Sequence, residues 1–311
     1  MVEILTNTKG MTNEEWLEWR NKGIGGSDVA TICGLNKYKS ALELWMEKLG
    51  YKECDEVGEA AYWGTTLEHI VREEFMKRSG LQVDTINLML KHPEHEFMLA
   101  NVDGIITDHE GRKCIFEAKT ASAYKLDQWK DDEIPESYML QIQHYMAVTG
   151  YERTYIAVLI GGNTFKYTVV DKDEELISMI MQIEKQFWDC VTSDIAPEVD
   201  GSESCTNMLN NLYASSKKGN SIILPDEAQT IIEEYNKNKE QESYYTEKKN
   251  ECVNKLKSLI EENEVATINN STITWKSSTS ERIDTKKLKE EQPEIYNKYL
   301  KKINMRRFVI K

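Results

Sequence analysis

The sequence has no long apolar stretch. Nowhere in its 311 residues does an apolar run approach the roughly 20 residues that a membrane-spanning helix needs. The first ten residues, MVEILTNTKG, have neither the basic region nor the apolar run of a signal peptide. We therefore expect a protein that stays in the cytoplasm.

Closely spaced cysteines are also missing. The six cysteines are scattered along the chain, and no two are separated by only two residues, which argues against a zinc or iron–sulfur site and against a disulfide framework. His92 and His95 could ligate a metal, but such a pair beside Pro93 is more typical of a surface turn.

The sequence also has no excess of basic residues, since its net charge is −14. Residues 1–196 carry 34 acidic against 20 basic side chains, whereas residues 197–311 carry 19 of each. This balance lowers the expectation of a nucleic-acid partner without excluding one, since an acidic protein can still line one groove with Lys and Arg. The acidic part also holds the carboxylates that a metal site would need.

Residues 1–196 show the pattern of a mixed α/β domain built on one central sheet. Thr12 and Glu15 form a capping box at the start of a helix, and a glycine turn leads into a second helix. In chain order, we then expect helices at 40–49 and 60–79, short strands within 81–120, a helix at 136–149, a hairpin from YIAVLIGG and FKYTVVD, and a helix at 173–193.

Residues 197–311 predict a smaller appended module. The segment GSESCTNMLNNLYASSKKGNS is polar and typical of a loop, and 225–264 is a Lys/Glu-rich helical segment, in one piece or two. A hairpin with an Asn-Asn turn at 269–270, a further helical piece and a final strand RRFVIK follow. The charged helix is either a solvated surface or an arm that binds a partner or another copy of the chain.

The chemically informative segment runs from Asp103 to Lys119. Glu117 and Lys119 are two residues apart on a strand, so their side chains share one face. An antiparallel pairing through the turn DHEGRK would bring Asp103 beside Glu117. Two converging carboxylates, with the carbonyl of Ala118 as a further oxygen, suit Mg²⁺, with Mn²⁺ as a substitute. Taken alone, this short pattern more often means an Asp in a turn and an exposed strand face.

Three further residues strengthen the pattern. Glu68 lies on an upstream helix and can add a carboxylate to the site. Gln141 and Tyr145 are four residues apart on the helix after the Glu–Lys strand, so they share one helix face. The Gln141 amide can donate to a phosphate or hold a water molecule, and Tyr145 can support it.

Together these motifs resemble those of a known family. The order E…D…E-x-K…Q-x-x-x-Y resembles the PD-(D/E)XK nucleases, and the segments GIGGSDVATICGLNKYKSALELW, WGTTLEHIVREEF, NVDGII, FEAKTA and QIQHYMAVTG resemble YqaJ-type viral recombinase nucleases, relatives of the λ-type alkaline exonuclease. The resemblance covers residues 12–195. The proline that names the motif is replaced by Val102, as in many members.

The resemblance implies a restriction-endonuclease-like α/β core with a central mixed sheet flanked by helices, plus a C-terminal helical and β appendage. It implies catalytic roles for Glu68, Asp103, Glu117, Lys119, Gln141 and Tyr145. Within this set, Asp103, Glu117 and Glu68 would be metal ligands, together with the Ala118 carbonyl, and Lys119 would position the attacking water.

A possible phosphate site lies near the N-terminus. Gly25 and Gly26 allow a tight turn before Ser27 and Asp28 open a helix whose free amides could bind an anion, with Arg20 adding charge. Asp28 opposes this interpretation, and Ser27 or Asp28 could simply cap the helix. The λ-type resemblance implies that Ser27 and Arg20 hold the 5′-phosphate of the degraded strand.

The function so implied is a Mg²⁺-dependent 5′→3′ exonuclease for double-stranded DNA, of phage or prophage origin, acting in the cytoplasm of a bacterial host. It would leave 3′ overhangs for a single-strand annealing protein and would form a homotrimeric ring. The alternatives are an endonuclease or junction resolvase on the same fold, and a DNA-binding scaffold without catalysis. We also expect Trp129, in a polar segment, as a candidate for stacking on a base.

Overall fold

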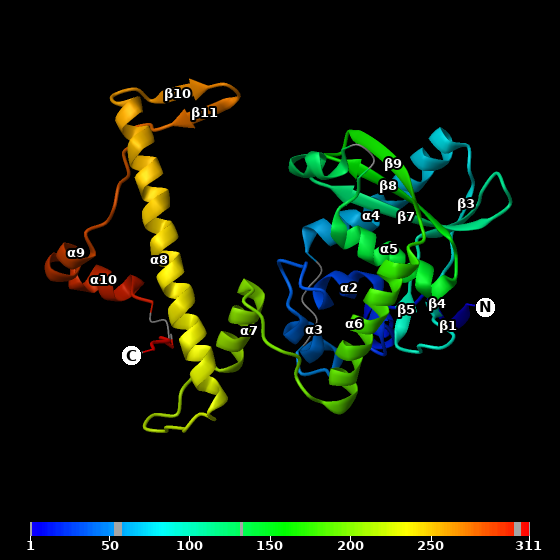
Figure 1. Cartoon of the computed structure of the whole chain (residues 1–311), viewed down its shortest axis with the longest axis horizontal. Coiled ribbons are helices and arrows are strands. Elements are labelled where there is room, and N and C mark those ends of the chain that lie inside the picture. Colours follow the sequence, from blue (N-terminus) through cyan, green and yellow to red (C-terminus); the bar gives the residue numbers. More distant parts are fainter. Residues whose placement is uncertain (1, 53–57, 131–132, 302–305, 311) are drawn as a thin grey trace. The chain divides into compact units, whose positions relative to one another are not determined.

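The computed structural model describes residues 2–52, 58–130, 133–301 and 306–310. It divides the chain into two units, Met1–Leu212 and Tyr213–Lys311, which are described separately (Figure 1). The division falls later than the boundary at 196/197 expected from the sequence. No helix in the described ranges is both long and apolar enough to cross a bilayer.

The first unit contains two sheets. One has the order β1-β4-β5-β2, and the other, which carries the expected catalytic segment, has the order β3-β6-β7-β8-β9. Strand bounds are Glu3–Asn7 (β1), Ile24–Gly25 (β2), Val83–Asp84 (β3), Leu88–Lys91 (β4), Met98–Ala100 (β5), Gly104–Thr107 (β6), Lys113–Ala121 (β7), Arg153–Ile160 (β8) and Thr164–Asp171 (β9).

Helices cover these sheets. Their bounds in the first unit are Asn13–Arg20 (α1), Gly26–Ile32 (α2), Ala41–Lys48 (α3), Glu59–Ser79 (α4), Glu136–Thr149 (α5), Glu174–Ser193 (α6) and Glu203–Leu212 (α7), with a 3₁₀ segment Ala123–Trp129. The capping box predicted for α1 is present: the Glu15 N–H donates to Thr12 Oγ1, and the Thr12 N–H donates to Glu15 Oε2. The expected mixed α/β class, with helices flanking a mixed sheet, is confirmed, but the strands of this unit form two sheets where one central sheet was expected.

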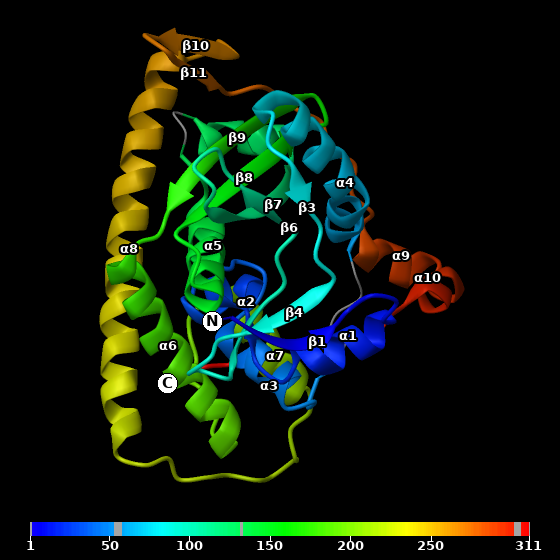
Figure 2. The ribbon, with the colours of Figure 1, turned by 90° about the vertical axis from the view of Figure 1, so that its right-hand side faces the viewer.

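The central strand β7 joins both kinds of pairing. It is antiparallel to β6 and parallel to β8. Its side chains alternate between two faces, as a strand requires. Phe116 packs with Phe75 of α4, whereas Ile115 packs in the core cluster that contains Tyr145 and Met146 of α5. Figure 2 shows β7 and β8 in the middle of their sheet, with α4 and α5 beside it.

Helix α7 corrects the expectation of a loop after Pro197. Cys205 is fully buried and Met208 is 7% exposed, both in the core cluster that contains Leu44 and Trp45 of α3. The hydroxyl of Ser204 accepts from the Ser40 N–H and donates to Glu43. The prediction missed this helix because its short apolar stripe lies among Asn and Ser side chains. This packing is why the first unit extends to Leu212.

The second unit is built around one long helix. α8 runs unbroken over Glu227–Ile260. The hairpin Val265–Ile268 (β10) and Ser271–Thr274 (β11) turns at Asn269 and Asn270, as predicted, with Asn269 at a φ of 49°. Helices Thr285–Glu291 (α9) and Pro293–Tyr299 (α10) follow. The prediction of a final strand in RRFVIK was wrong for residues 306–310. These residues form no strand, because no neighbouring strand pairs with them.

Candidate active site

Four elements bring the predicted catalytic residues together. Asp103 lies just before β6, and the pairing of Gly104 with Phe116 places it next to Glu117 on β7. Its Oδ2 accepts the backbone N–H of Ala118 at 2.8 Å. Glu117 and Lys119 project from the same face of β7, and Lys119 Nζ donates to Glu117 Oε1 at 2.7 Å. The expected antiparallel pairing through the turn at 108–113 is therefore present.

Gln141 connects this strand face to α5. Its amide nitrogen donates to Glu117 Oε1 at 2.7 Å and to Tyr145 Oη at 3.1 Å, while its carbonyl oxygen accepts from Lys119 Nζ at 3.0 Å. Both amide hydrogens are thus engaged. In this structure Gln141 holds Glu117 and Lys119 in place, with Tyr145 as its support, and has no hydrogen left for a phosphate.

The carboxylates of this cluster are electrostatically strained. Burial, followed by the charges of Glu117 and Glu68, raises the pKa of Asp103 well above 3.8. Burial also raises the pKa of Glu117, against the opposing effect of Lys119. Glu117 Oε2 is buried and has no hydrogen-bond partner. A buried carboxylate oxygen without a donor is costly, and a cation would remove that cost.

These oxygens fit a hard divalent cation. Asp103 and Glu117 supply two converging carboxylates, and the Ala118 backbone lies between their side chains. Glu68 is near enough for its charge to raise the pKa of both acids, but its Oε1 pairs with Arg72 at 2.9 Å. Accordingly, no three His, Cys, Asp or Glu side chains within the described ranges already form a metal-binding group.

Lys119 remains charged in this environment. Burial alone would lower its pKa, but the charges of Glu117 and Asp103 outweigh that effect and raise it above 10.5. Its Nζ also lies 4.8 Å from the ring centroid of Tyr138, a cation–π contact. Tyr138 was not predicted as a site residue, although Tyr138, Gln141 and Tyr145 follow the i, i+3, i+7 spacing of one helix face.

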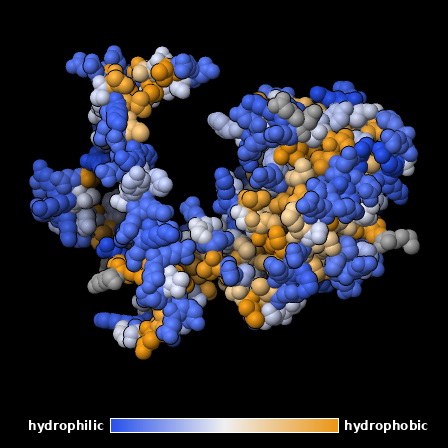
Figure 3. Space-filling view, viewed as in Figure 1, coloured by the Kyte–Doolittle hydropathy of each residue, from blue (hydrophilic) through white to orange (hydrophobic). Residues whose placement is uncertain are grey.

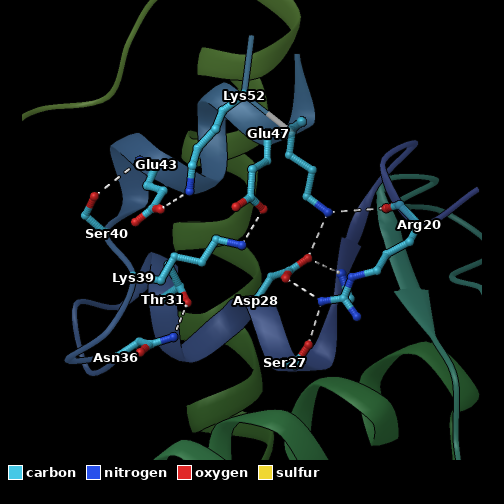
Figure 4. Close-up of polar contacts among 12 residues, drawn as sticks. Arg20, Ser27, Asp28, Thr31, Asn36, Lys39, Ser40, Glu43, Glu47 and Lys52 are labelled. Carbon is cyan, nitrogen blue, oxygen red and sulfur yellow. Dashed lines mark hydrogen bonds and ion pairs between the residues drawn. The ribbon is translucent and has the colours of Figure 1, made fainter. Parts of the chain in front are cut away.

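The predicted phosphate-binding pair also comes together, within a charged network (Figure 4). Arg20 Nη2 donates to Ser27 Oγ at 2.6 Å and to Asp28 Oδ1 at 2.5 Å. Lys48 Nζ, whose side chain is 1% exposed, donates to Asp28 Oδ2 at 2.8 Å. Burial would raise the pKa of Asp28, but Arg20 and Lys48 outweigh it and hold that pKa well below 3.8.

Asp28 therefore has a structural role. It accepts the Gly25 N–H at 3.1 Å, which confirms the capping alternative for this residue, and it fixes the Arg20 guanidinium. Lys48 was not predicted as part of this network. A lysine at the end of the apolar helix ALELWMEK is the signal that could have marked it.

Gly26 lets the helix that carries Ser27 pack closely against the helix that carries Gln141. A Cβ atom at this position would lie 2.5 Å from Cε1 of Tyr145 and 3.0 Å from Cγ of Gln141, closer than real Cβ contacts allow. Only glycine thus permits α2 to approach α5 this closely. Ser27 and Gln141 consequently line one cleft of about 710 Å³, together with Lys37, Tyr38, Lys125 and Tyr138.

Two sequence candidates lie outside the site. Trp129, the expected stacking residue, is 3% exposed and packs against Ile156 and Val158, so it cannot stack on a base. That expectation was wrong because the polar sequence around Trp129 conceals a buried position. His92 forms a turn in which its Nδ1 accepts the N–H groups of Glu94 and His95, as the surface-turn alternative predicted.

Comparisons with known proteins agree with this architecture. Residues 15–152 match the YqaJ-like viral recombinase domain. The chain is 44% identical over 313 residues to the protein YqaJ of Bacillus subtilis (strain 168), covering 99% of this chain and 97% of that protein. The relative thus extends over both structural units.

Solved structures share the fold. An alkaline exonuclease, LHK-Exo from Laribacter hongkongensis, superposes with a TM-score of 0.50 at 22% identity, covering 64% of this chain and 100% of that one. LHK-Exo in complex with dAMP gives a TM-score of 0.50 at 21% identity, covering 65% and 98%. Since the full-length similarity to YqaJ joins a family-model match that spans the candidate active site, the chain belongs to the family of YqaJ-like viral recombinases.

Proposed function

We propose that the protein is a metal-dependent 5′→3′ exonuclease that degrades one strand of double-stranded DNA and leaves 3′ overhangs for recombination. The observation that carries this proposal is the buried Glu117, with one oxygen held by Lys119 and Gln141 and the other without a donor beside Asp103. Membership in the viral recombinase family and the shared alkaline-exonuclease fold support it.

We assign the cation site to Asp103, Glu117 and the Ala118 carbonyl, with Glu68 as a further carboxylate, and expect Mg²⁺ with Mn²⁺ as a substitute. A bound cation would supply Lewis acidity toward a phosphodiester. The protein's own contribution is positioning and charge. Gln141 fixes the orientation of Glu117, and the charged Lys119 can hold a water molecule and offset negative charge on the attacked phosphate.

The cleft supports the proposed polarity of degradation. Arg20 and Ser27 lie beside each other, and Ser27 lines the cleft that also contains Gln141. We assign the terminal 5′-phosphate to this pair. Lys37 and Lys125 line the same cleft and can contact a nucleic-acid backbone, although Glu133 and Glu136 line it too and balance their charge.

We further propose a homotrimer that encloses the duplex and a single-strand annealing protein as partner. Both follow from the resemblance to λ-type exonucleases. We place the contact with the annealing protein on Tyr213–Lys311, because the candidate active site lies entirely in the first unit.

One assay tests the reaction. A duplex labelled separately at each end, with a 5′-phosphate or a 5′-hydroxyl, is incubated with and without Mg²⁺, beside a covalently closed circle. We expect Mg²⁺-dependent loss of label from 5′-phosphorylated ends and an intact circle. Cleavage of the circle would identify an endonuclease, and no cleavage with any divalent metal would identify a DNA-binding scaffold.

The 5′-phosphate site has its own test. The variant Ser27→Ala should digest 5′-phosphorylated ends about tenfold more slowly, because one hydrogen bond to a charged group is worth roughly 1.5–3 kcal/mol. It should leave the slower digestion of 5′-hydroxyl ends unchanged. An equal loss on both substrates would remove Ser27 from recognition of the terminus.

A further inference from the structure

The helix α8 has almost no partner among the described residues of its unit. Along its 34 residues only Ile260 is buried. Apolar side chains on it are widely exposed: Ile231 is 68% exposed, Tyr245 68% and Leu259 80%. A helix of this length that neither packs nor forms a fully polar surface is typical of an interaction element.

Many of the apolar residues of α8 follow a heptad, although the exposed Tyr244 and Val253 lie off its seam. Near the start of the helix, Ala228, Ile231 and Tyr235 are spaced by three and four residues. The same alternation reaches Cys252, Leu256 and Leu259 near its end. Side chains repeating in this way form one seam along a helix, the arrangement by which coiled coils pair.

The middle of the seam is polar. Asn238, Glu242 and Lys249 occupy the same heptad positions there. Figure 3 correspondingly shows α8 as hydrophilic along its middle, with hydrophobic surface where it meets the hairpin. Polar side chains inside a seam select one register and orientation at some cost in stability.

Charge is distributed unevenly along the helix. Residues 227–242 hold five glutamates and two lysines, whereas residues 243–260 hold two glutamates and four lysines. The first half is therefore acidic and the second half basic. Two such helices side by side attract each other when they run in opposite directions.

We propose that α8 pairs with α8 of a second copy of the chain as an antiparallel two-helix coiled coil. This inference is independent of the proposed nuclease function. Centred on the helix midpoint, the pairing places Ile231 against Leu256 of the second copy and Tyr235 against its Cys252. A twofold axis repeats each contact, so the interface is self-complementary.

The flanking positions agree with this register. Glu234 faces Lys255 of the second copy beside the seam, and Ile232 faces its Val253 on the other side. Asn238 meets Lys249, and Glu242 meets Tyr245. A parallel pairing in register would instead oppose Glu242 to Glu242 and Lys249 to Lys249, which like-charge repulsion disfavours.

A charge-swap experiment on the full chain tests the contact. The molar mass is measured by light scattering across a concentration series. We expect the apparent Kd of the pairing to rise about tenfold in Glu234→Lys and in Lys255→Glu, and to return to the wild-type value in the double variant, which restores opposite charges. Glu240→Lys and Lys237→Glu, on the outer face, serve as matched controls that keep the wild-type Kd.

The reference for this experiment is Ile231→Glu/Leu256→Glu, which should lower the wild-type mass to that of the assembly formed without α8 pairing, while circular dichroism verifies that the helix persists. An unchanged mass in this reference, or a double swap no better than the singles, would overturn the proposal. Because mass is the readout, failure here leaves the nuclease assay untouched.

Cross-linking tests the direction of the helices. In the antiparallel register the two Cys252 thiols are about 26 Å apart, from seventeen residues at 1.5 Å each. A short bismaleimide should therefore not join wild-type chains through Cys252, but should join Tyr235→Cys to Cys252 of the second copy. The variant Tyr235→Cys/Cys252→Ser is the control. A Cys252–Cys252 cross-link in the wild type, identified by peptide mapping, would show a parallel pair and refute the antiparallel one.

Discussion

At the scale of single residues, the site is a balance of buried charges. Glu117, Lys119 and Gln141 hold one another through three short contacts. Asp103 and Glu117 both have raised pKa values because burial disfavours their ionised forms. The metal-free chain thus carries an unfavourable excess of negative charge at the place where the proposed cation binds.

Replacing Lys119 should separate catalysis from binding. We expect Lys119→Ala to lower the cleavage rate at least 100-fold, because a charged donor aimed at the reacting phosphate typically contributes that much. The Kd for duplex DNA, measured by fluorescence anisotropy in Ca²⁺, should stay within about threefold of wild type. Lys185→Ala is the matched control, since its side chain is exposed on α6 and does not line the cleft. Cleavage by Lys119→Ala at the wild-type rate would exclude a catalytic role for Lys119.

Neutralising Asp103 should stabilise the metal-free protein. The ionised carboxylate is disfavoured by its surroundings, so we expect Asp103→Asn to raise the melting temperature at pH 8 by a few degrees, about 1 kcal/mol. Mg²⁺ should raise the melting temperature of the wild type but not of this variant. Asp108→Asn is the contrast: hydrogen bonds from Arg112 and Glu110 lower the pKa of Asp108 despite burial, so that variant should be less stable. A less stable Asp103→Asn would contradict this account.

At the scale of elements, a buried histidine and its two hydrogen-bond partners connect helix α5 to helix α6 and to strand β5. His144 of α5 has its Nδ1 2.6 Å from Glu184 Oε1 of α6, and its Nε2 donates to the carbonyl of Leu99 on β5 at 2.8 Å. Both side chains are fully buried. Burial would lower the pKa of His144, but the Glu184 carboxylate and these hydrogen bonds raise it above 6.5.

This pair predicts a pH dependence of stability. Because the folded-state pKa of His144 lies above its ordinary value, its contribution is complete below pH 6.5 and is lost as the pH rises through the folded-state pKa. Urea unfolding between pH 6 and 9 should show a decline of up to about 1.4 kcal/mol per pH unit. Glu184→Gln should flatten this slope and cost about 2 kcal/mol at pH 6. Glu175→Gln, exposed on the same helix, should retain the slope.

At this scale, local patterns gave most of the fold. Strand alternation predicted that Glu117 and Lys119 share a face beside Asp103, and the i, i+4 spacing of α5 predicted that Gln141 and Tyr145 share another. That the two groups converge was implied by the family resemblance. Burial that depends on distant segments was not predictable from such patterns. Trp129 lies in a polar stretch yet is covered by β8, and the α7 helix is stabilised by α3, more than 150 residues earlier in the chain.

At the scale of the whole molecule, the boundary between units has a measurable consequence. A chain ending at Leu212 keeps Cys205 and Met208 in the core, whereas a chain ending at Ala196 loses both. Removing two buried apolar side chains costs roughly 4 kcal/mol or more, on the order of 10 °C in melting temperature. We therefore expect the longer fragment to melt well above the shorter one. Equal melting temperatures would place the boundary before α7.

The close approach at Gly26 has a further consequence for the products. Since α2 rests directly on the side chains of Gln141 and Tyr145, the proposed 5′-phosphate site on α2 and the proposed cation site beside α5 are held next to each other. With the terminal phosphate held there, as proposed, this spacing should give every excised fragment the same length. A side chain at position 26 should push α2 away from α5. Fragments of unequal length should then appear in a gel ladder before the fold is lost.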